Sequence, residues 1–495
     1  MPGTILIIGA GLAGLSAGCY AQMHGYRTRI LELHDKPGGL CTGWHRKGYT
    51  FDGCMHILTG VAQSSAYYAL WQDLGVIPQI PMLFFDESVR IEGPDGRALT
   101  LHADLERLTE HLHALAPEDG AAIRRYVDSV RRFADLRPFD LTLLSPLEAV
   151  RAVLPNLGAL VGSVRSTQGA YAQRFSSPFM RRAFPYVQYS IPEAPMLPHL
   201  AIYAQIVSRT GGWPVGGSLA LARAIERRYL ELGGEIQYRA RVTKILVEDD
   251  RAVGVRLEDG SEERAERVVS AADGHSTIYD LLGGAYADER LRRYYDAKPD
   301  MLQFGVHVSL GVARDLSHEP HALTLLLDEP LTLGDRPHDR LDVENYAFDK
   351  SLAPAGKTAL KVAVDARYDY WRALRDDPAR YREEKERVAE AVIGRLEERF
   401  PGLSSDVEVV DVATPVTTEH YTANWRGLQA WPAPGNPLAS MTRGVSRTLP
   451  GLAGFHMAGQ WAEGQLGIPT AVSSGRDLVR RLCREDGRAF GARTG

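Results

Sequence analysis

Three glycines close to the N-terminus have the spacing of a phosphate-binding turn. Gly9, Gly11 and Gly14 directly follow an apolar run, and a helical segment begins just after them. At this spacing the first glycine permits a tight turn, the second lets the backbone approach a pyrophosphate, and the third lets the helix pack closely on the strand. The free N–H groups at the helix start then face the phosphates. The pattern predicts a dinucleotide site that includes Leu12 and Ala13.

An acidic residue and a pair of glycines continue this pattern. A second apolar run ends in Glu32, at the distance where a carboxylate contacts a ribose hydroxyl. Gly38 and Gly39 follow, and a glycine pair suits close passage beside a cofactor because any Cβ would clash there. An NAD site does not need this pair, and no second Gly-x-Gly-x-x-Gly follows a strand. We therefore predict FAD rather than NAD(P), with Leu33 and Leu40 beside it.

From the glycine turn onward, the chain resembles the flavin amine oxidase superfamily, and within it the branch of phytoene desaturases and carotenoid isomerases. That branch opens with the same fingerprint, acidic strand end and glycine pair, and then a Gly-Tyr/Phe-x-Phe-Asp stretch, here residues 48–52. The likeness covers nearly the whole chain and is weakest in the middle. It implies an α/β fold: a Rossmann-type FAD-binding domain interleaved with an α+β substrate-binding domain that carries a helical cap.

The resemblance also assigns cofactor contacts in two later segments. In the family, the residue that matches Val242 packs at the adenine through backbone contacts. Ala271 lies in the buried strand that the sequence predicts at 267–272. Relatives carry an acidic residue near the C-terminus that holds the ribityl chain. Gln460, preceded by Gly459, stands at that position here. An amide can still bond the ribityl hydroxyls.

The last helical segment completes the cofactor site that the resemblance implies. It opens at Gly467 and continues through Ile468 and Thr470. The start of this helix points at the pyrimidine edge of the flavin in relatives, where its positive dipole end favours the negative charge that develops on reduction. An ordinary turn into a helix is the alternative.

Few catalytic side chains are expected, because a flavin accepts a hydride without help from the protein. In relatives the stretch just before His56 passes close to the isoalloxazine, so this imidazole is a candidate to accept or donate a proton during C–H cleavage. A structural histidine is the alternative. Tyr421 and Trp461 are candidates for a pocket wall over the flavin, against plain core packing. Glu463 is the only carboxylate between the C-terminal strand and the last helix, and it is a candidate base.

The elements that position these residues alternate between two domains. The chain has 495 residues, too many for one hydrophobic core. We predict FAD-binding parts at 1–75, 207–285 and 432–495, and substrate-binding parts at 76–206 and 286–431. An amphipathic helix at 219–232 and alternating strands at 241–247 and 252–257 support the middle FAD-binding part.

Composition limits the partners of the protein. The net charge of −5 argues against nucleic acid, because phosphate binding needs a cationic surface. Four cysteines show no CxxC spacing and no zinc pattern, so we expect a cytoplasmic protein with reduced thiols and no metal site. Apolar runs edged by arginines in 76–206 suit peripheral contact with a membrane. A helical cap with solvated arginines is the preferred alternative, and we see no apolar stretch long enough to span a bilayer.

Four functions remain open. The first is desaturation, or in reverse saturation, of a C–C bond in a hydrophobic polyene, isoprenoid or acyl substrate, by hydride transfer to flavin N5. A redox-neutral double-bond isomerase would use the same cofactor. A flavin amine oxidase is compatible with the superfamily. The fourth is a lipid-binding escort that resembles the Rab GDP-dissociation inhibitors. Such a protein would not require the phosphate-binding glycines, yet all of them are present.

Overall fold

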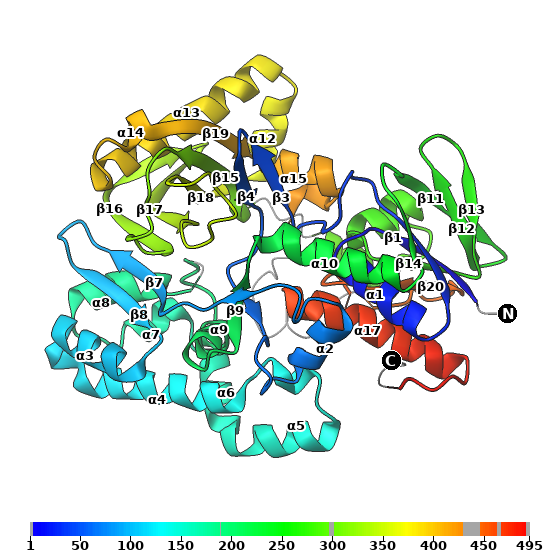
Figure 1. Ribbon diagram of the computed structural model, residues 1–495, viewed down its shortest axis with the longest axis horizontal. Coiled ribbons are helices and arrows are strands. Elements are labelled where there is room, and N and C mark those ends of the chain that lie inside the picture. Colours follow the sequence, from blue (N-terminus) through cyan, green and yellow to red (C-terminus); the bar gives the residue numbers. More distant parts are fainter. Residues whose placement is uncertain (1–2, 189, 297–300, 429–445, 463–466, 492–495) are drawn as a thin grey trace.

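The computed structural model describes residues 3–188, 190–296, 301–428, 446–462 and 467–491 (Figure 1). In this view the nucleotide-binding sheet lies on the right, a larger sheet lies at the upper left, and a group of helices lies below that larger sheet. The interleaved α/β architecture agrees with the fold class expected from the sequence. The exact domain boundaries stay a prediction.

The nucleotide-binding domain is built on a parallel sheet of five strands in the order β10-β2-β1-β14-β20. Its strands are β1 (Thr4–Ile8), β2 (Arg27–Leu31), β10 (Glu235–Gln237), β14 (Arg267–Ser270) and β20 (Phe455–Met457). Side chains of β1 alternate between two cores. Ile5 and Ile7 pack in the core with three helices, whereas Leu6 and Ile8 pack in the core with an antiparallel sheet.

Segments far apart in the chain form these two layers. The helices are α1 (Leu12–Met23), α10 (Gly217–Glu231) and α17 (Ile468–Glu485). The antiparallel sheet comprises β11 (Val242–Glu248), β12 (Arg251–Leu257) and β13 (Glu262–Arg264). These bounds of α10, β11 and β12 agree with the amphipathic helix and the alternating strands predicted from the sequence.

The second domain is built on a sheet of seven strands in the order β19-β15-β18-β17-β16-β7-β8. These strands are β7 (Glu87–Glu92), β8 (Ala98–His102), β15 (Met301–Val312), β16 (Ala322–Leu333), β17 (Arg336–Asn345), β18 (Thr358–Arg367) and β19 (Val407–Ala413). Because β7 pairs with β16, both predicted substrate-binding segments contribute to one sheet. The helices of the later segment are α11 (Glu289–Tyr295), α12 (Tyr368–Arg375), α13 (Pro378–Arg399), α14 (Leu403–Asp406) and α15 (Pro415–Thr422).

A helical cap with its own hydrophobic core lies beside β7 and β8. Its helices are α3 (Leu105–Leu115), α4 (Gly120–Leu136), α5 (Pro146–Val153), α6 (Leu157–Arg165), α7 (Gln168–Ala172), α8 (Pro178–Ala183) and α9 (Met196–Val207). Short elements join the two domains: β3 (Gly43–Arg46), β4 (Tyr49–Asp52), β5 (Leu58–Thr59), α2 (Tyr67–Asp73), β6 (Met82–Leu83) and β9 (Gly211–Pro214).

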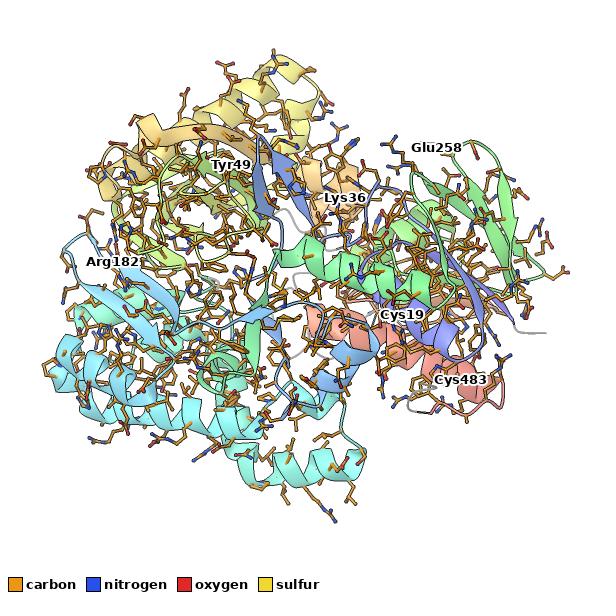
Figure 2. The ribbon with its side chains drawn as sticks, viewed as in Figure 1. Cys19, Lys36, Tyr49, Arg182, Glu258 and Cys483 are labelled. Carbon is orange, nitrogen blue, oxygen red and sulfur yellow. The ribbon has the colours of Figure 1, made fainter. Side chains whose placement is uncertain are left out.

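The hairpin β3–β4 packs against the seven-stranded sheet (Figure 2). The ring of Tyr49 packs against Gly311 of β15, where an added Cβ would lie 2.7 Å from a ring carbon. Its hydroxyl donates to Glu408 of β19 at 2.7 Å. The backbone of Thr50 donates to Leu352 O at 2.8 Å. Residues just after the predicted FAD turn therefore form part of the boundary with the substrate domain.

One helical stretch of the described residues, Leu147–Arg165, is long and apolar enough to cross a membrane by length and composition alone, contrary to expectation. A 3-10 turn at Leu154–Asn156 divides it into α5 and α6. Only 6% of the apolar window is buried. The large apolar side chains that this stretch exposes, by 39–68%, are Leu147, Val150, Leu154, Leu157 and Val161. Their spacing of three and four residues is that of one helix face.

Candidate functional site

The glycine turn between β1 and α1 has the geometry of a phosphate cradle. Gly9 has φ +97° and its N–H donates to Leu31 O at 2.8 Å. A Cβ on Gly14 would lie 2.0 Å from Gly9 O, so the helix approaches the strand as closely as predicted. Gly11 begins α1 without any side-chain cap, and a Cβ there would meet no atom within 4 Å. This uncapped helix start, with open space before it, fits a pyrophosphate.

Glu32 lies at the end of β2 and braces that turn. Its Oε2 accepts a hydrogen bond from the Ala10 N–H at 2.6 Å, and its Oε1 accepts one from His34 N–H at 2.8 Å. Burial raises the pKa of this carboxyl, and the backbone donors oppose the shift. The sequence indicated a ribose contact, which stays a prediction. It did not indicate that the same carboxylate holds the phosphate turn in place.

The glycine pair lies directly against the phosphate turn. Gly38 N–H donates to Ala10 O at 2.9 Å, and Gly38 forms an isolated parallel bridge with Gly11. A Cβ on Gly38 would lie 2.1 Å from Cys41 O, and one on Gly39 would lie 3.4 Å from the Gly11 Cα. No larger residue fits at Gly38. The half-buried Leu33 and Leu40 flank Glu32 and the glycine pair in the sequence.

Two further predicted contacts converge on the same turn. Ala271 N–H donates to Ile8 O at 2.9 Å, and its carbonyl oxygen lies 3.5 Å from the Cβ position of Gly9. A Cβ on Gly459 would lie 3.5 Å from the Ala13 Cβ on α1. Ala271 and Gly459 therefore both lie directly against the residues that form the phosphate cradle. Gln460 follows Gly459 directly and is half-buried.

The adenosine end of the predicted site is formed by β2 and β11. Ala240 N–H donates to Glu32 O at 2.9 Å, which places the start of β11 beside the end of β2. Val242 is the first residue of β11 and is buried. The structure thus brings Val242 close to the acidic strand end, and its contact with the adenine stays a prediction.

The helix α17 starts without a side-chain cap and crosses α1 closely. Gly467 has φ +102° at its N-cap, and Ile468 and Thr470 lie in its first turn. A Cβ on Gly475 would lie 2.6 Å from both Ala13 O and Ala17 N. This close crossing fixes α17 against the phosphate-binding helix. β5 also contacts α17, so the segment that follows the glycine pair reaches the second helix as well.

His56 lies in that segment and faces a buried ion pair from the substrate domain. Its Nδ1 lies 3.2 Å from Glu344 Oε1 on β17. Glu344 Oε2 lies 2.9 Å from Lys361 Nζ on β18, and Lys361 also donates to Asp52 O of β4 at 3.2 Å. The Lys361 side chain is 4% exposed and that of Glu344 is 15% exposed. We call His56, Glu344 and Lys361 the junction triad.

Electrostatics in the junction triad favour an ionised carboxylate beside a neutral imidazole. Burial opposes ionisation of Glu344, yet Lys361 and then His56 outweigh it and lower the pKa of the carboxyl to about 2. Partial desolvation by the surrounding protein lowers the pKa of His56, with Glu344 opposing that shift. The His56 side chain keeps 42% of its surface exposed. The group therefore combines access with a proton-accepting form at neutral pH.

Asp52 fixes the backbone from which His56 projects. Its Oδ1 accepts from the N–H groups of Cys54 and Met55, each at 3.0 Å. Its Oδ2 accepts from Ser218 N–H at the start of α10 at 2.6 Å. The Gly-Tyr-Thr-Phe-Asp stretch was identified in the sequence only by resemblance. The structure shows that its aspartate ties three segments together.

Two other candidate catalytic residues that the structure describes, Tyr421 and Trp461, have surroundings different from those of His56. The Tyr421 ring lies 4.9 Å from the ring of His34, beside the end of β2. That position is at the predicted ribose end of the site, and the role of Tyr421 as a pocket wall over the flavin stays a prediction. Trp461 is buried in a core with Met457, and Glu463 lies outside the described residues.

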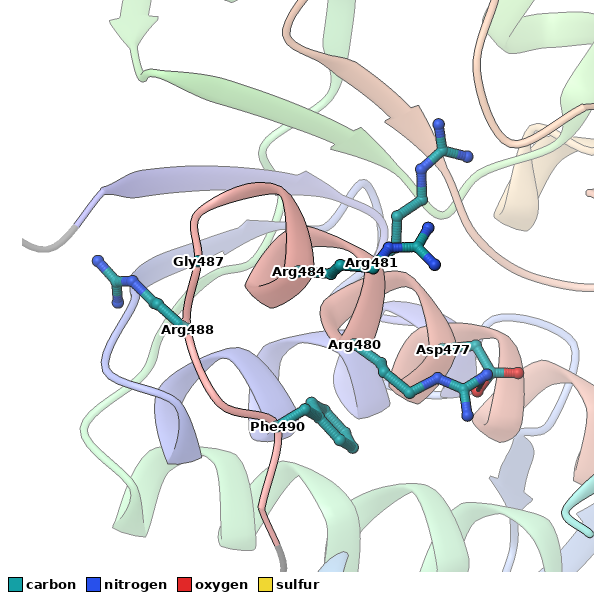
Figure 3. A pocket seen from close by; sticks show the side chains of 7 residues that line it. All are labelled: Asp477, Arg480, Arg481, Arg484, Gly487, Arg488 and Phe490. Carbon is teal, nitrogen blue, oxygen red and sulfur yellow. Dashed lines mark ion pairs between the residues drawn. The ribbon is translucent and has the colours of Figure 1, made fainter. Parts of the chain in front are cut away.

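Other features of the described residues do not compete with this site. A surface hollow on the outer side of α17 is lined by arginines, Asp477 and Phe490 (Figure 3). It belongs to the far end of that helix and is not the cradle. No group of three metal-ligating side chains occurs among the described residues. The four cysteines are free thiols.

The fold and the cradle define an FAD-dependent oxidoreductase. The family described as flavin containing amine oxidoreductase matches residues 12–277, more than half of the chain. The chain belongs to this family, and FAD is its cofactor.

Similar proteins place the chain near enzymes of carotenoid chemistry, as the resemblance indicated. It is 25% identical to a chloroplastic prolycopene isomerase of Arabidopsis thaliana over 97% of this chain and 83% of the relative. It is 26% identical to a lycopene-forming phytoene desaturase of Pseudescherichia vulneris over 83% of this chain and 85% of the relative.

Solved structures share the fold. An oxidoreductase from Methanosarcina mazei superposes with a TM-score of 0.60 at 17% identity, covering 96% of this chain and 100% of that one. A fatty acid isomerase from P. acnes superposes with a TM-score of 0.53 at 15% identity, covering 97% and 98%. At these identities the likeness establishes the architecture only.

Proposed function

We propose that the protein desaturates, or in reverse saturates, a C–C bond in a hydrophobic polyene, isoprenoid or acyl substrate. Bound FAD supplies a hydride acceptor at N5. The observation that carries the proposal is the junction triad, which holds one accessible neutral imidazole between the nucleotide-binding and substrate sheets. His56 takes up or returns a proton there. The uncapped starts of α1 and α17 favour negative charge on the cofactor.

A redox-neutral double-bond isomerase is the second candidate. The similarity to prolycopene isomerases over 97% of the chain favours it. The two candidates need the same cradle and differ in electron flow. A desaturase consumes one equivalent of an acceptor such as oxygen or a quinone per double bond, whereas an isomerase consumes none.

An anaerobic visible spectrum of the purified holoenzyme separates these candidates. We expect one member of a polyene, isoprenoid and unsaturated acyl panel to bleach the oxidised flavin band. Conversion of a substrate only after chemical reduction of the flavin, without acceptor consumption, would instead identify the isomerase. Peroxide production with simple amines would identify an amine oxidase. A protein that stays colourless after incubation with FAD would revive the lipid-binding escort.

We also propose that the protein is cytoplasmic and docks reversibly on a membrane through α5 and α6. Five exposed apolar side chains form one face of this stretch. Residues 141–192 contain five arginines and a single acidic residue, Glu148, although the whole chain is acidic. Apolar contact edged by cationic side chains suits an anionic bilayer surface. A hydrophobic substrate dissolved in that bilayer would then be close to the enzyme.

Vesicle sedimentation tests this docking. We expect the wild type to sediment with vesicles of anionic phospholipid, and the double variant Val150→Glu, Leu154→Glu to stay in solution. Leu230 on α10 is 47% exposed, so Leu230→Glu is the matched control and should sediment as the wild type does. Equal sedimentation of all three proteins, or none with the wild type, would exclude the docking surface.

A further inference from the structure

The backbone around His56 connects both ends of the predicted flavin site. Gly53 N–H donates to Thr42 O at 2.9 Å, in the segment that follows the glycine pair. His56 lies three residues after Gly53. The strand β5 begins two residues after His56 and contacts α17. The segment therefore runs from the glycine pair to the second uncapped helix. An imidazole on it lies where the reacting end of the cofactor is expected.

Glu344 uses both carboxylate oxygens to organise this imidazole. One oxygen faces His56 Nδ1 at 3.2 Å, and the other accepts from Lys361 at 2.9 Å and from the hydroxyl of Tyr346. An ionised carboxylate only accepts hydrogen bonds. The neutral ring must therefore carry its proton on Nδ1, and its lone pair must lie on Nε2.

The charges around His56 come from three elements. Glu344 and Asp342 lie on β17, Lys361 lies on β18, and Asp52 lies on β4. His321, just before β16, is itself influenced by Glu344 and His56, and burial lowers its pKa to about 4. The carboxylate of Glu344 lies 3.2 Å from Nδ1 of the ring and is its counter-charge. Loss of that carboxylate should change the tautomer and the pKa of His56 together.

We propose that Glu344 is a positioning residue that holds His56 with Nε2 as the proton acceptor, and that Lys361 keeps Glu344 ionised. The inference rests on the proposed function. When one carbon of the substrate loses a hydride to the acceptor that bound FAD would supply, the neighbouring C–H proton passes to Nε2 and the electron pair of that C–H bond becomes the new C=C bond. The resulting imidazolium is neutralised by Glu344. In the reverse direction Nε2 returns the proton.

A purely structural ion pair is the competing explanation, since the triad joins two domains and removal of one partner of a buried pair is destabilising. The chain offers a matched control. Glu408 lies 2.6 Å from Lys357 within the substrate domain and accepts from the Tyr49 hydroxyl at 2.7 Å across the same domain boundary, and neither contact involves His56. Glu408→Gln removes a similar Glu-Lys-Tyr contact without touching His56.

Kinetics of the holoenzyme give the first test. We expect Glu344→Gln to lower kcat by about 100-fold, the usual scale of a lost acid–base contribution, with KM and flavin content unchanged. The acidic limb of the pH profile should move to lower pH, because a neutral amide no longer favours the imidazolium. Glu344→Asp should recover most of the rate, and Glu408→Gln should keep it. Equal rate loss in Glu344→Gln and Glu408→Gln, without a pH shift, would overturn the proposal.

Nitrogen NMR of histidine-labelled holoenzyme gives a second readout that needs no substrate. With the signals assigned through His56→Gln, the wild type should show the proton on Nδ1 of His56, and Glu344→Gln should show it redistributed to Nε2. An unchanged tautomer would overturn the positioning role. If no panel compound reacts, the proposed substrate class fails, while the NMR result still decides whether Glu344 sets the tautomer.

Discussion

Gly11 and Gly14 are three residues apart, yet a methyl group has different consequences at each. Gly11 has φ −64°, which any residue adopts, and no atom lies within 4 Å of its Cβ position. Gly14 has a carbonyl oxygen 2.0 Å from its Cβ position. One glycine is required by the cofactor and the other by the protein itself.

We predict that Gly11→Ala folds normally and loses FAD. Its apoprotein should lose no more than about 0.5 kcal/mol, the scale of an N-cap change from glycine. Its affinity for FAD should fall at least about 10-fold, or about 1.4 kcal/mol, because the methyl group occupies the phosphate position. Thermal melting of the apoprotein and the ratio of flavin to protein absorbance measure the two effects. Full flavin content in this variant would contradict the cradle.

For Gly14→Ala we expect both the stability of the apoprotein and its affinity for FAD to fall. Overpacking of a close contact costs about 1–3 kcal/mol, so the melting temperature of the apoprotein should drop along with flavin content. The same two measurements apply. A variant that melts as the wild type does would show that the turn can relax around the added methyl group.

Individual site residues differed in how far the sequence could predict them. The glycines, Glu32 and the glycine pair form one local pattern, so their convergence followed from a known turn geometry. Glu344 and Lys361 are far from His56 in the sequence, and no local spacing connects them. The contact between Tyr421 and His34 could not be predicted for the same reason, because the two residues lie far apart in the sequence.

Helices α1 and α17 depend on small residues where they cross. Gly475 of α17 packs on the backbone of Ala13 and Ala17, and Ser16 Oγ donates to Val472 O at 2.7 Å. Close contact between these helices carries the C-terminal part of the cofactor site to the phosphate cradle. The crossing is thus an element-level requirement of the site.

The same substitution in two helices should have opposite effects. Gly475→Ala should destabilise the protein by about 1–3 kcal/mol, because the methyl group meets backbone atoms 2.6 Å away. Gly394 lies inside α13 with no atom within 4 Å of its Cβ position, so Gly394→Ala should stabilise by about 0.5–1 kcal/mol. Urea denaturation of both variants checks this. Stabilisation by Gly475→Ala would mean that the helices can separate without cost.

Local periodicity predicted many of the elements but not their pairing. The run before Gly9, the helix near 219–232 and the strands near 241–257 follow from apolar spacing and turn residues. The parallel pairing of β7 with β16 joins segments more than 200 positions apart, which no periodicity encodes. The apolar face of α5 and α6 was visible only as scattered runs, since exposure depends on the packing around them.

Acidic pH should lower the stability of the fold, because several histidines are buried in different parts of the molecule. Burial lowers the pKa of His199 to about 3 and that of His456 to about 4, and His321 behaves similarly. The pKa of histidine in the unfolded chain is near 6.5, so below that pH the unfolded chain binds more protons than the folded protein does. Stability therefore falls as pH decreases toward 4. Asp273, whose pKa burial raises to about 6, acts in the opposite direction but is a single group.

We predict that His199→Gln flattens this dependence. His199 is fully buried, and its Nε2 lies 2.8 Å from the Tyr126 hydroxyl. Between pH 7 and pH 5 this histidine becomes protonated only in the unfolded chain, so the free energy of unfolding should fall by about 2 kcal/mol. Melting temperatures at both pH values measure the effect. The control His318→Gln, at a side chain that is 71% exposed, should keep the wild-type difference. An unchanged difference in His199→Gln would show that acid acts elsewhere.

The strand order of the nucleotide-binding sheet has a consequence for biosynthesis. β14 has β1 on one side and β20 on the other, and among the described elements β20 and α17 follow the substrate domain in the sequence. While the ribosome is still making the substrate domain, β14 has an open edge and α1 lacks its partner helix. Open edges and uncovered apolar helices are where nascent chains aggregate. We therefore expect FAD to bind only after β20 and α17 have been made, and a chain truncated before residue 455 should be retained by chaperones rather than released as a smaller flavoprotein.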